Sequence, residues 1–323
     1  INEGITVVKR VGKIGEELTF TQKKSNISIG HTRWSTHGSP SQKNAHPHLS
    51  CNKEIAVVHN GIIENYEEIK YNLKNHKFKS DTDTEVVSHL IEEYMKDNSY
   101  RDAVLMVAKE LKGSFALMIL NKSCDEIIAI RKGSPLVLGV KENEFFLASD
   151  LFALLRHTNN VIFLEDNEAV ILGSDIEIIN FNTGIKIDKK PNLVDIKFNE
   201  SDKGDFPHFM LKEIYEQPTV IKKTIEGLMD DKLSFNIPKK MLSKLNKVII
   251  VACGTSWHAG LVAEYLIEQF SNISVEVEYA SEFRYRDPVI DKNTLVVAIS
   301  QSGETADTNA AVKEAKKKGA FIF

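Results

Sequence analysis

Two short turns in the second half of the sequence combine glycine with several hydroxyl side chains. The stretch CGTSWHAG covers residues 253–260, and the stretch SQSGETADT covers residues 300–308. Each follows an apolar run and precedes a helical pattern, so each is predicted to join the carboxyl end of a strand to a helix start. Helix starts offer free N–H groups to a phosphate, and serine and threonine hydroxyls add neutral donors. This pattern predicts a site for a small phosphorylated ligand.

The same hydroxyls have an alternative role as helix N-caps. A single turn of this kind is most simply explained as a cap, whereas two in one sheet, each with glycine and several hydroxyls, favour binding. The sequence contains neither GxxxxGK[ST] nor GxGxxG, so a nucleotide-binding loop is unsupported.

The first half holds residue types suited to an α-amino acid. Arg33 offers a forked donor for a carboxylate, and Asp83 can accept hydrogen bonds from an ammonium group. Asn60 and Gly61 follow an apolar run and are expected at a strand end, where an amide and a backbone N–H stabilise a developing oxyanion. The alternative is an ordinary Arg33–Asp83 ion pair and a hairpin turn at Asn-Gly. The residue types alone leave both interpretations open.

Histidine is concentrated in one part of the first half. Five of the ten histidines lie within residues 31–59. Their spacing does not match HExxH, and they fall on predicted strand ends and loops. We therefore predict no metal ligands and no cofactor.

The elements that position these residues differ between the two halves. The first half groups its predicted helices and strands separately, which indicates a layered α+β domain. Its expected helices cover residues 65–76, 83–97 and 100–111, and its expected strands begin with residues 27–34 and 54–61. From about residue 246, strands alternate with helices, as in a parallel, doubly wound sheet. Residues 190–205 are polar and predicted to be a linker, and the helical pattern that follows is expected to break at Pro218.

Composition limits the classes of partner. The 323 residues suffice for two domains, and the net charge of −4 gives no electrostatic footprint for nucleic acid. Cys51, Cys124 and Cys253 form no CxxC pair, which favours a reducing compartment. No apolar run reaches membrane-spanning length. We predict small-molecule ligands and neither nucleic-acid nor membrane partners.

Together, these motifs resemble those of the glutamine–fructose-6-phosphate aminotransferase (isomerizing) family, also called glucosamine-6-phosphate synthases. The stretches GHTRWSTHG, NAHPH, VVHNGIIENY and SDTDTE are similar to its class II glutamine amidotransferase domain. The stretches ACGTSWHAG and SQSGETADT are similar to the first of its two sugar isomerase (SIS) domains. The match spans the whole chain, and the order of the motifs is more specific than any one of them.

The resemblance implies a fold and a domain organisation. A four-layer αββα sandwich of the N-terminal nucleophile amidotransferase type is expected at residues 1–189, with its N-terminus missing. The linker at 190–205 then leads to an α/β parallel-sheet SIS domain at 206–323, incomplete at its C-terminal end. A cytoplasmic location and a full-length homodimer are also expected from the family.

The resemblance also implies a reaction. An N-terminal cysteine attacks the amide of glutamine, and the released ammonia travels through the protein to fructose 6-phosphate. The products are glucosamine 6-phosphate and glutamate, in the first step of the hexosamine (UDP-N-acetylglucosamine) pathway. No cofactor is implied.

The family's roles transfer to matching positions of this sequence. Asn60 and Gly61 would form the oxyanion hole. The residues expected to bind glutamine are Arg33 at its carboxylate, Asp83 at its amino group, and Trp34, Thr36 and His37 around the pocket. The residues expected to bind the sugar phosphate are Thr255, Ser256, Ser300, Gln301, Ser302 and Thr305.

The sequence departs from the family in two ways. None of its three cysteines lies in the family's nucleophile motif, and the second SIS domain has no counterpart among the 323 residues. We therefore expect a fragment that is inactive alone. The alternative hypothesis is a phosphosugar-binding SIS sensor with a degenerate amidotransferase-like domain.

Overall fold

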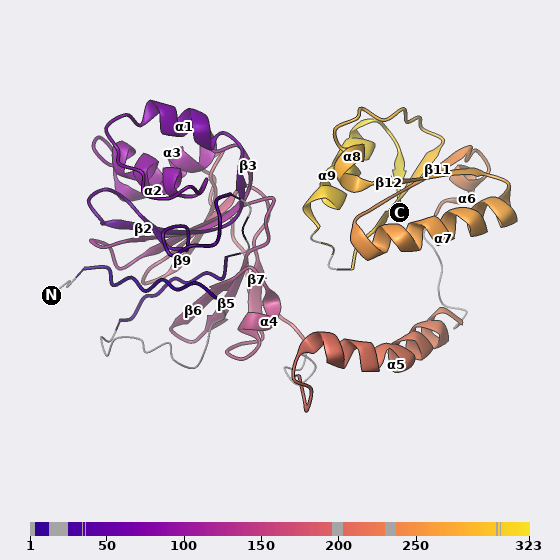
Figure 1. Ribbon diagram of the computed structural model, residues 1–323, viewed down its shortest axis with the longest axis horizontal. Coiled ribbons are helices and arrows are strands. Elements are labelled where there is room, and N and C mark those ends of the chain that lie inside the picture. The colour runs from indigo at the N-terminus through magenta and orange to yellow at the C-terminus, as the bar shows by residue number, and fades with distance from the viewer. Residues whose placement is uncertain are drawn as a thin grey trace. The chain divides into compact units, whose positions relative to one another are not determined.

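The computed structural model describes residues 4–12, 25–33, 35, 37–195, 203–229, 237–301, 303 and 305–323. The chain forms two compact units, Ile1–Glu200 and Ser201–Phe323 (Figure 1). Part of the predicted linker belongs to the first unit, because strand β10 (Asn192–Leu193) pairs with β7 (Asn160–Phe163).

Two antiparallel sheets form the centre of the first unit. The larger sheet has the strand order β1 (His48–Leu49), β2 (Ile55–Ile63), β3 (Gly113–Asn121), β4 (Ile127–Lys132), β8 (Glu168–Leu172) and β9 (Ile176–Asn180). The smaller sheet has the order β10, β7, β5 (Val137–Lys141) and β6 (Glu144–Ala148).

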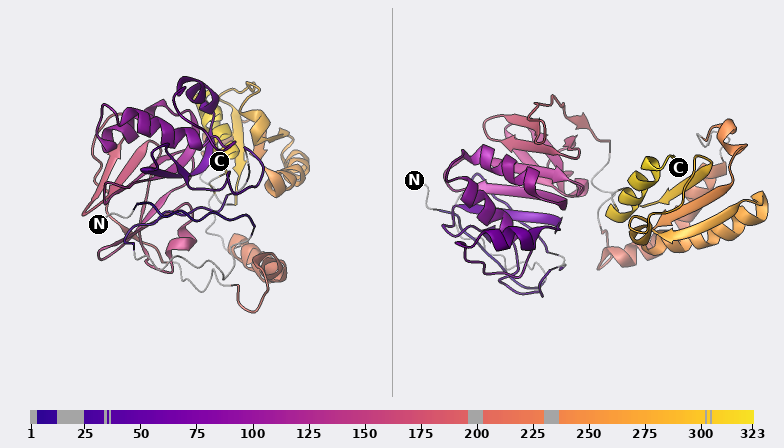
Figure 2. Two further views of the ribbon diagram at one scale, coloured as in Figure 1. Left: turned by 60° about the vertical axis from the view of Figure 1, so that its left-hand side comes forward. Right: turned by 90° about the horizontal axis from the view of Figure 1, so that it is seen from above.

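Side chains along β3 point alternately to the two faces of the larger sheet and so connect its layers. Phe115, Leu117 and Ile119 enter the core beneath helices α1 (Tyr66–Asn72), α2 (Glu85–Tyr94) and α3 (Tyr100–Glu110). Ala116 and Met118 point the other way, into the core between the two sheets. The short helix α4 (Leu151–Leu154) packs on the far side of the smaller sheet. The expected αββα sandwich is confirmed, and Figure 2 shows its helices against the sheets.

The expected strand over residues 27–34 is wrong for its described part. Residues 27–33 carry no strand pairing, so Arg33 lies on an irregular segment. The alternating pattern of ISIGHTRW is compatible with a strand, but pairing also requires a neighbouring edge.

The second unit is an α/β domain with a parallel sheet, as expected. Its strand order is β12 (Ser274–Tyr279), β11 (Lys247–Ala252), β13 (Thr294–Ile299) and β14 (Phe321–Ile322). The side chains of consecutive residues of β11 pack on opposite faces of this sheet. Ile249 and Val251 pack in the core with α8 (Ala280–Phe283) and α9 (Ala306–Lys317), whereas Val248 and Ile250 pack in the core that receives side chains of α7 (Gly254–Ser271).

Helices α5 (Phe209–Met229) and α6 (Lys239–Leu242) precede this sheet. The expected break at Pro218 is wrong, because α5 runs through it as one helix. Proline removes one helical hydrogen bond, which does not by itself end a helix of this length.

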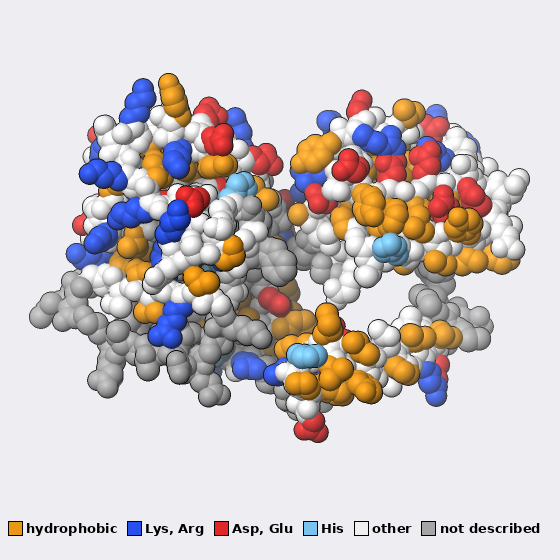
Figure 3. Space-filling view, viewed as in Figure 1, with side chains coloured by type: hydrophobic (Ala, Val, Ile, Leu, Met, Phe, Trp, Pro, Cys, Tyr) orange, Lys and Arg blue, Asp and Glu red, His pale blue; other side chains and the backbone are white. Residues whose placement is uncertain are grey.

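Apolar side chains are exposed along both α5 and α7 (Figure 3). On α7 they include Val262, Tyr265 and Phe270, each more than half exposed. None of the helices in the described ranges is both long and apolar enough to cross a membrane.

Replacement of Gly61 by alanine is expected to destabilise the first unit. Gly61 has φ of +134°, and an added Cβ would lie 2.0 Å from the carbonyl oxygen of Ser114. We expect Gly61→Ala to lower the free energy of unfolding by about 3 kcal/mol or more, measured by hydrogen exchange of the β2 and β3 amides. The matched control is Gly30→Ala, whose Cβ would meet nothing within 4 Å. A change at Gly61→Ala within about 0.5 kcal/mol of wild type would contradict the prediction.

Candidate active sites of the two units

The two hydroxyl-rich turns lie at one edge of the parallel sheet. Strands β11 and β13 are neighbours, and Ala252 at the end of one is in register with Ile299 at the end of the other. The turns that begin at Cys253 and Ser300 therefore emerge side by side. Ligands of open parallel sheets bind beyond this carboxyl edge.

The turn at residues 300–305 is closed around the hydroxyl of Ser300. This oxygen accepts a hydrogen bond from the N–H of Gly303 at 3.0 Å and lies 3.1 Å from the hydroxyl of Thr305. The side chain of Asn309, from the first turn of α9, donates to the carbonyl of Gly303 at 3.0 Å. Hydrogen bonds thus link the described residues Ser300, Gly303 and Thr305 of this turn to one another and to α9.

The N-cap residues of the two helices that follow these turns, Cys253 for α7 and Thr305 for α9, make no side-chain cap hydrogen bond. The first-turn N–H groups of a helix have no intrahelical acceptors. These N–H groups can serve an anion, and the hydroxyl of Thr305 does not cap α9 as the N-cap alternative requires.

The placements of the six predicted phosphate contacts are as follows. Thr255 and Ser256 lie in the first turn of α7, Ser300 and Gln301 follow β13, and Thr305 precedes α9. Ser302 lies outside the residues that the structure describes.

In the first unit, the loop before α2 directs Asp83 against β2. The Asp83 carboxylate is buried and accepts a hydrogen bond from the N–H of Ile63 at 2.8 Å. It also lies 3.9 Å from Nδ1 of His59, which is 2.9 Å from the hydroxyl of Thr84. Asp83 is therefore a fixed negative charge beside the strand that carries Asn60 and Gly61.

The side chain of Arg33 forms hydrogen bonds with residues that follow it closely in the chain. Its guanidinium donates to the carbonyl of His37, to the carbonyl of Gly38 at 3.1 Å and to the hydroxyl of Ser35 at 3.3 Å. Among the described residues it makes no ion pair with Asp83, so the simple ion-pair alternative is wrong. His37 packs edge-on against Tyr66, with ring centroids 5.3 Å apart.

Asn60 and Gly61 lie within β2, not at its end as expected. The strand continues to Ile63, and Gly61 is paired with Phe115 of β3. A hairpin turn at Asn-Gly is therefore wrong as well. The side-chain amide of Asn60 has no hydrogen-bond partner among the described residues and can bind a ligand. Trp34 and Thr36 lie outside the described part of the chain.

Three of the clustered histidines are buried links between elements. Nδ1 of His46 accepts from the N–H of His59 at 3.2 Å, and Nε2 of His48 lies 3.1 Å from the hydroxyl of Thr82. Burial lowers the pKa of all three, that of His48 to about 3 and that of His59 to about 4. They are neutral at pH 7.

A second cluster, formed by Cys51, His76, His89 and Glu92, was not predicted from the sequence. Its one local signal is the i, i+3 spacing of His89 and Glu92 on a helix. The other two ligand-type side chains reach the same point only through the tertiary fold.

Comparisons with known proteins agree with this two-part organisation. A family model described as glutamine amidotransferase domain matches residues 8–181, and one described as SIS domain matches residues 241–322.

Three curated relatives share the description glutamine–fructose-6-phosphate aminotransferase [isomerizing]. The relative from Bacteroides thetaiotaomicron is 48% identical over 339 positions, covering 100% of this chain and 55% of the relative. That from Clostridium acetobutylicum is 48% identical over 338 positions, with 100% and 55% covered. That from Thermococcus kodakarensis is 46% identical over 320 positions, with 97% and 53% covered. The chain spans about half the length of the curated relatives it matches.

Acid is expected to destabilise the first unit through its buried histidines. Below their ordinary pKa of about 6.5 the unfolded chain binds protons that folded His46, His48 and His59 exclude, so stability falls as pH falls. We expect the free energy of unfolding to drop by up to about 4 kcal/mol per pH unit near pH 5, since each excluded proton contributes about 1.4 kcal/mol per unit. Hydrogen exchange of β2 amides at several pH values measures this slope.

The control for this prediction uses two single variants. His48→Asn should reduce the slope by about 1.4 kcal/mol per pH unit, because one excluded proton is removed. His258→Asn, at an exposed position in the second unit, should leave it unchanged. Equal slopes in wild type and His48→Asn would contradict the assignment.

Proposed function

Since the chain belongs to the glutamine amidotransferase domain family, we propose that it forms the glutamine site and the first sugar-phosphate site of a glutamine–fructose-6-phosphate aminotransferase. The complete reaction converts fructose 6-phosphate and glutamine into glucosamine 6-phosphate and glutamate. It is proposed for a protein of the relatives' full length. The observation that carries the proposal is the joint presence of a buried carboxylate beside β2 and, after β13, a hydrogen-bonded hydroxyl-rich turn that leads into α9 without a side-chain cap at Thr305.

The first unit is proposed to bind glutamine. The buried charge of Asp83 suits the α-amino group, and the guanidinium of Arg33 suits the α-carboxylate. His37, Trp34 and Thr36 are proposed to line the pocket. Asn60 offers an amide without another partner in the described residues, and with the N–H of Gly61 it would stabilise the oxyanion formed when a thiolate attacks the glutamine amide.

The second unit is proposed to bind the phosphate of fructose 6-phosphate. The closed loop at Ser300 and the first turns of α7 and α9 present hydroxyl and N–H donors at one edge of the sheet. Thr255, Ser256, Gln301, Ser302 and Thr305 complete the proposed set. Ammonia from the first unit would then aminate the sugar at C2, and isomerisation of the aminated sugar would follow.

The three cysteines of the sequence have other neighbours. The thiol of Cys51 faces His76 and His89, and Cys124 follows β3. Cys253 precedes α7, and its sulfur accepts a hydrogen bond from the hydroxyl of Thr308 in α9 at 3.9 Å. We therefore propose that none of the three is the glutaminase nucleophile, and that the 323 residues bind both substrates without turning them over.

We also propose a homodimer. Large apolar side chains exposed along α7 favour association because water contact with them is unfavourable. Light scattering of the purified chain should give twice its mass of 36.4 kDa. A monomer at micromolar concentration would contradict the proposal for this chain.

Glutamine binding provides the test of the first unit. Asp83→Asn keeps an acceptor for the N–H of Ile63 but removes the charge, so the Kd for glutamine should rise about ten- to hundredfold, the loss of one hydrogen bond to a charged group. Asp81→Asn is the matched control, because Asp81 is an exposed carboxylate paired with Lys43. Calorimetry measures both. Equal Kd values for the two variants would contradict the role of Asp83 in glutamine binding. Glutamate formation by the unmodified chain would contradict the proposal that the 323 residues do not turn glutamine over.

Fructose 6-phosphate binding provides the test of the second unit. Ser300→Ala removes a donor and loosens the loop at Gly303, so affinity should fall about ten- to hundredfold. Ser243→Ala, at an exposed position in the same unit, is the control. Fructose without the phosphate should bind neither variant nor wild type measurably. Equal affinity for fructose and its phosphate would overturn the phosphate assignment.

A further inference from the structure

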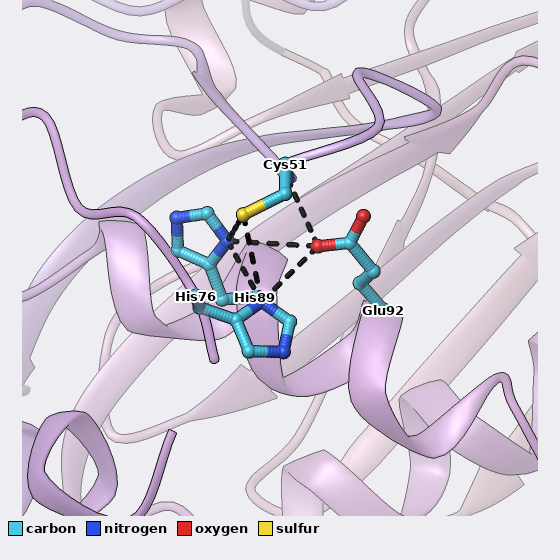
Figure 4. Close-up of side chains that lie close together, drawn as sticks. All are labelled: Cys51, His76, His89 and Glu92. Atoms are coloured by element: carbon cyan, nitrogen blue, oxygen red, sulfur yellow. Dashed lines mark hydrogen bonds and ion pairs between the residues drawn. The ribbon is translucent and has the colours of Figure 1, made fainter. Parts of the chain in front are cut away.

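Four metal-ligand side chains from three segments meet outside the proposed glutamine site (Figure 4). Cys51 lies in the turn between β1 and β2, and His76 follows α1. His89 and Glu92 are three residues apart on α2 and so share one face of that helix. The side chains of His76 and His89 are 6% and 2% exposed, so the two imidazoles are removed from water, whereas Cys51 is exposed.

The four ligand atoms face one point. Nδ1 of His76 and Nδ1 of His89 are 3.3 Å apart, and Sγ of Cys51 lies 3.7 and 3.6 Å from them. Oε2 of Glu92 is 3.2 Å from Nδ1 of His76 and 3.7 Å from Nδ1 of His89. All four lie within 4.8 Å of one another.

The nitrogen–nitrogen separation and the two sulfur–nitrogen separations match edges of a tetrahedral zinc site. Zinc binds imidazole nitrogen and carboxylate oxygen at about 2.0–2.1 Å and thiolate sulfur at about 2.3 Å. A regular tetrahedron with those bonds has edges of about 3.3 Å between two nitrogens and about 3.6 Å between sulfur and nitrogen. The observed nitrogen–nitrogen and sulfur–nitrogen distances agree with these values to within roughly 0.2 Å.

The partners of each ligand fix it for metal binding. Nε2 of His76 lies 2.8 Å from the carboxylate of Glu93, and Nε2 of His89 lies 3.5 Å from that of Glu85. A proton held on Nε2 of His76 by Glu93 leaves the Nδ1 lone pair of His76 free for a metal, which is the usual arrangement around ligating histidines.

The other two ligands are held by backbone donors. The N–H of Lys77 donates to Sγ of Cys51 at 3.3 Å. The N–H groups of Cys51 and Asn52 donate to the two oxygens of Glu92 at 2.9 and 2.8 Å. The carboxylate therefore keeps its orientation without a metal.

The alternative is a reactive thiol activated by a neighbouring histidine. A Cys–His nucleophile needs one base, whereas here a second imidazole and a carboxylate converge on the same point. One shared proton joins only one pair of these four side chains. A divalent cation can bind all four at once, so the geometry favours a metal.

We propose that Cys51, His76, His89 and Glu92 bind one Zn²⁺ ion in a closed, structural site. Four protein ligands leave no position for substrate, so the ion has no part in turnover. Binding releases the thiol proton of Cys51 to solvent. The ion ties the β1–β2 turn and the segment after α1 to α2, directly after the loop that carries Asp83.

Metal analysis of the purified 323-residue chain tests the proposal. After loading with zinc chloride and gel filtration, the chain should retain one equivalent of zinc. Cobalt(II) in its place should give the intense visible bands of a tetrahedral ion and a thiolate-to-cobalt charge-transfer band. Removal of zinc by EDTA should lower the melting temperature of the first unit.

Variants within one domain provide the controls. Cys51→Ser should abolish the charge-transfer band and weaken zinc binding by more than about a hundredfold, and Glu93→Gln should weaken it about ten- to hundredfold through His76. Cys124→Ser, at the other cysteine of the first unit, should bind zinc like wild type. Circular dichroism establishes that each variant is folded.

A further measurement needs no variant. Zinc should slow alkylation of Cys51 by iodoacetamide and leave that of Cys124 unchanged. Failure of the loaded chain to retain zinc, or unchanged zinc affinity in folded Cys51→Ser, would overturn the proposal. Alkylation of Cys51 that zinc does not slow would also overturn it and would assign the thiol to nucleophilic chemistry. These results are independent of glutamine binding, which the Asp83→Asn experiment measures separately.

Discussion

The buried carboxylate of Glu85 is the interaction on which the geometry of the first unit depends. Its oxygens accept hydrogen bonds from the N–H groups of Lys79 and Ser80 and from the Ser80 hydroxyl, at 2.6–3.0 Å. Burial acts to raise the pKa of this carboxyl, but hydrogen bonds from His89, Ser80 and Lys79 outweigh burial and lower it to about 2. The charged form therefore persists, and it fixes the loop that leads into α2.

Both the candidate glutamine site and the metal-ligand cluster are built outward from this loop. Asp83, two residues before Glu85, reaches the N–H of Ile63 in β2. His89, one turn after Glu85, faces the metal-ligand cluster with one nitrogen and Glu85 with the other. A single helix start thus couples a proposed structural ion to the position of a proposed substrate contact. Rigid support of this kind is what keeps a binding geometry within a fraction of an ångström.

The second unit solves the positioning problem differently. Its site depends on the register of β11 and β13, which brings two turns far apart in sequence to one edge of the sheet. The buried strands set that register, since a shift by one residue would exchange the residues of β11 between its two cores. The hydroxyl of Ser300 then closes the second turn locally.

The sequence by itself determined the class of each unit and the types of residue at each candidate site. Periodicity is a local property, so it separated the α+β half from the alternating half, and the hydroxyl-rich turns were visible without a fold. It misplaced Asn60 and Gly61 at a strand end and expected a strand that includes Arg33, because strand pairing depends on neighbours distant in the chain. The tertiary structure alone brought Cys51, His76 and Glu92 together, since their separations of 25 and 16 residues carry no period that would reveal a shared point. Side chains from different segments converge because of tertiary packing, and this packing depends on contacts between residues that are distant in the sequence.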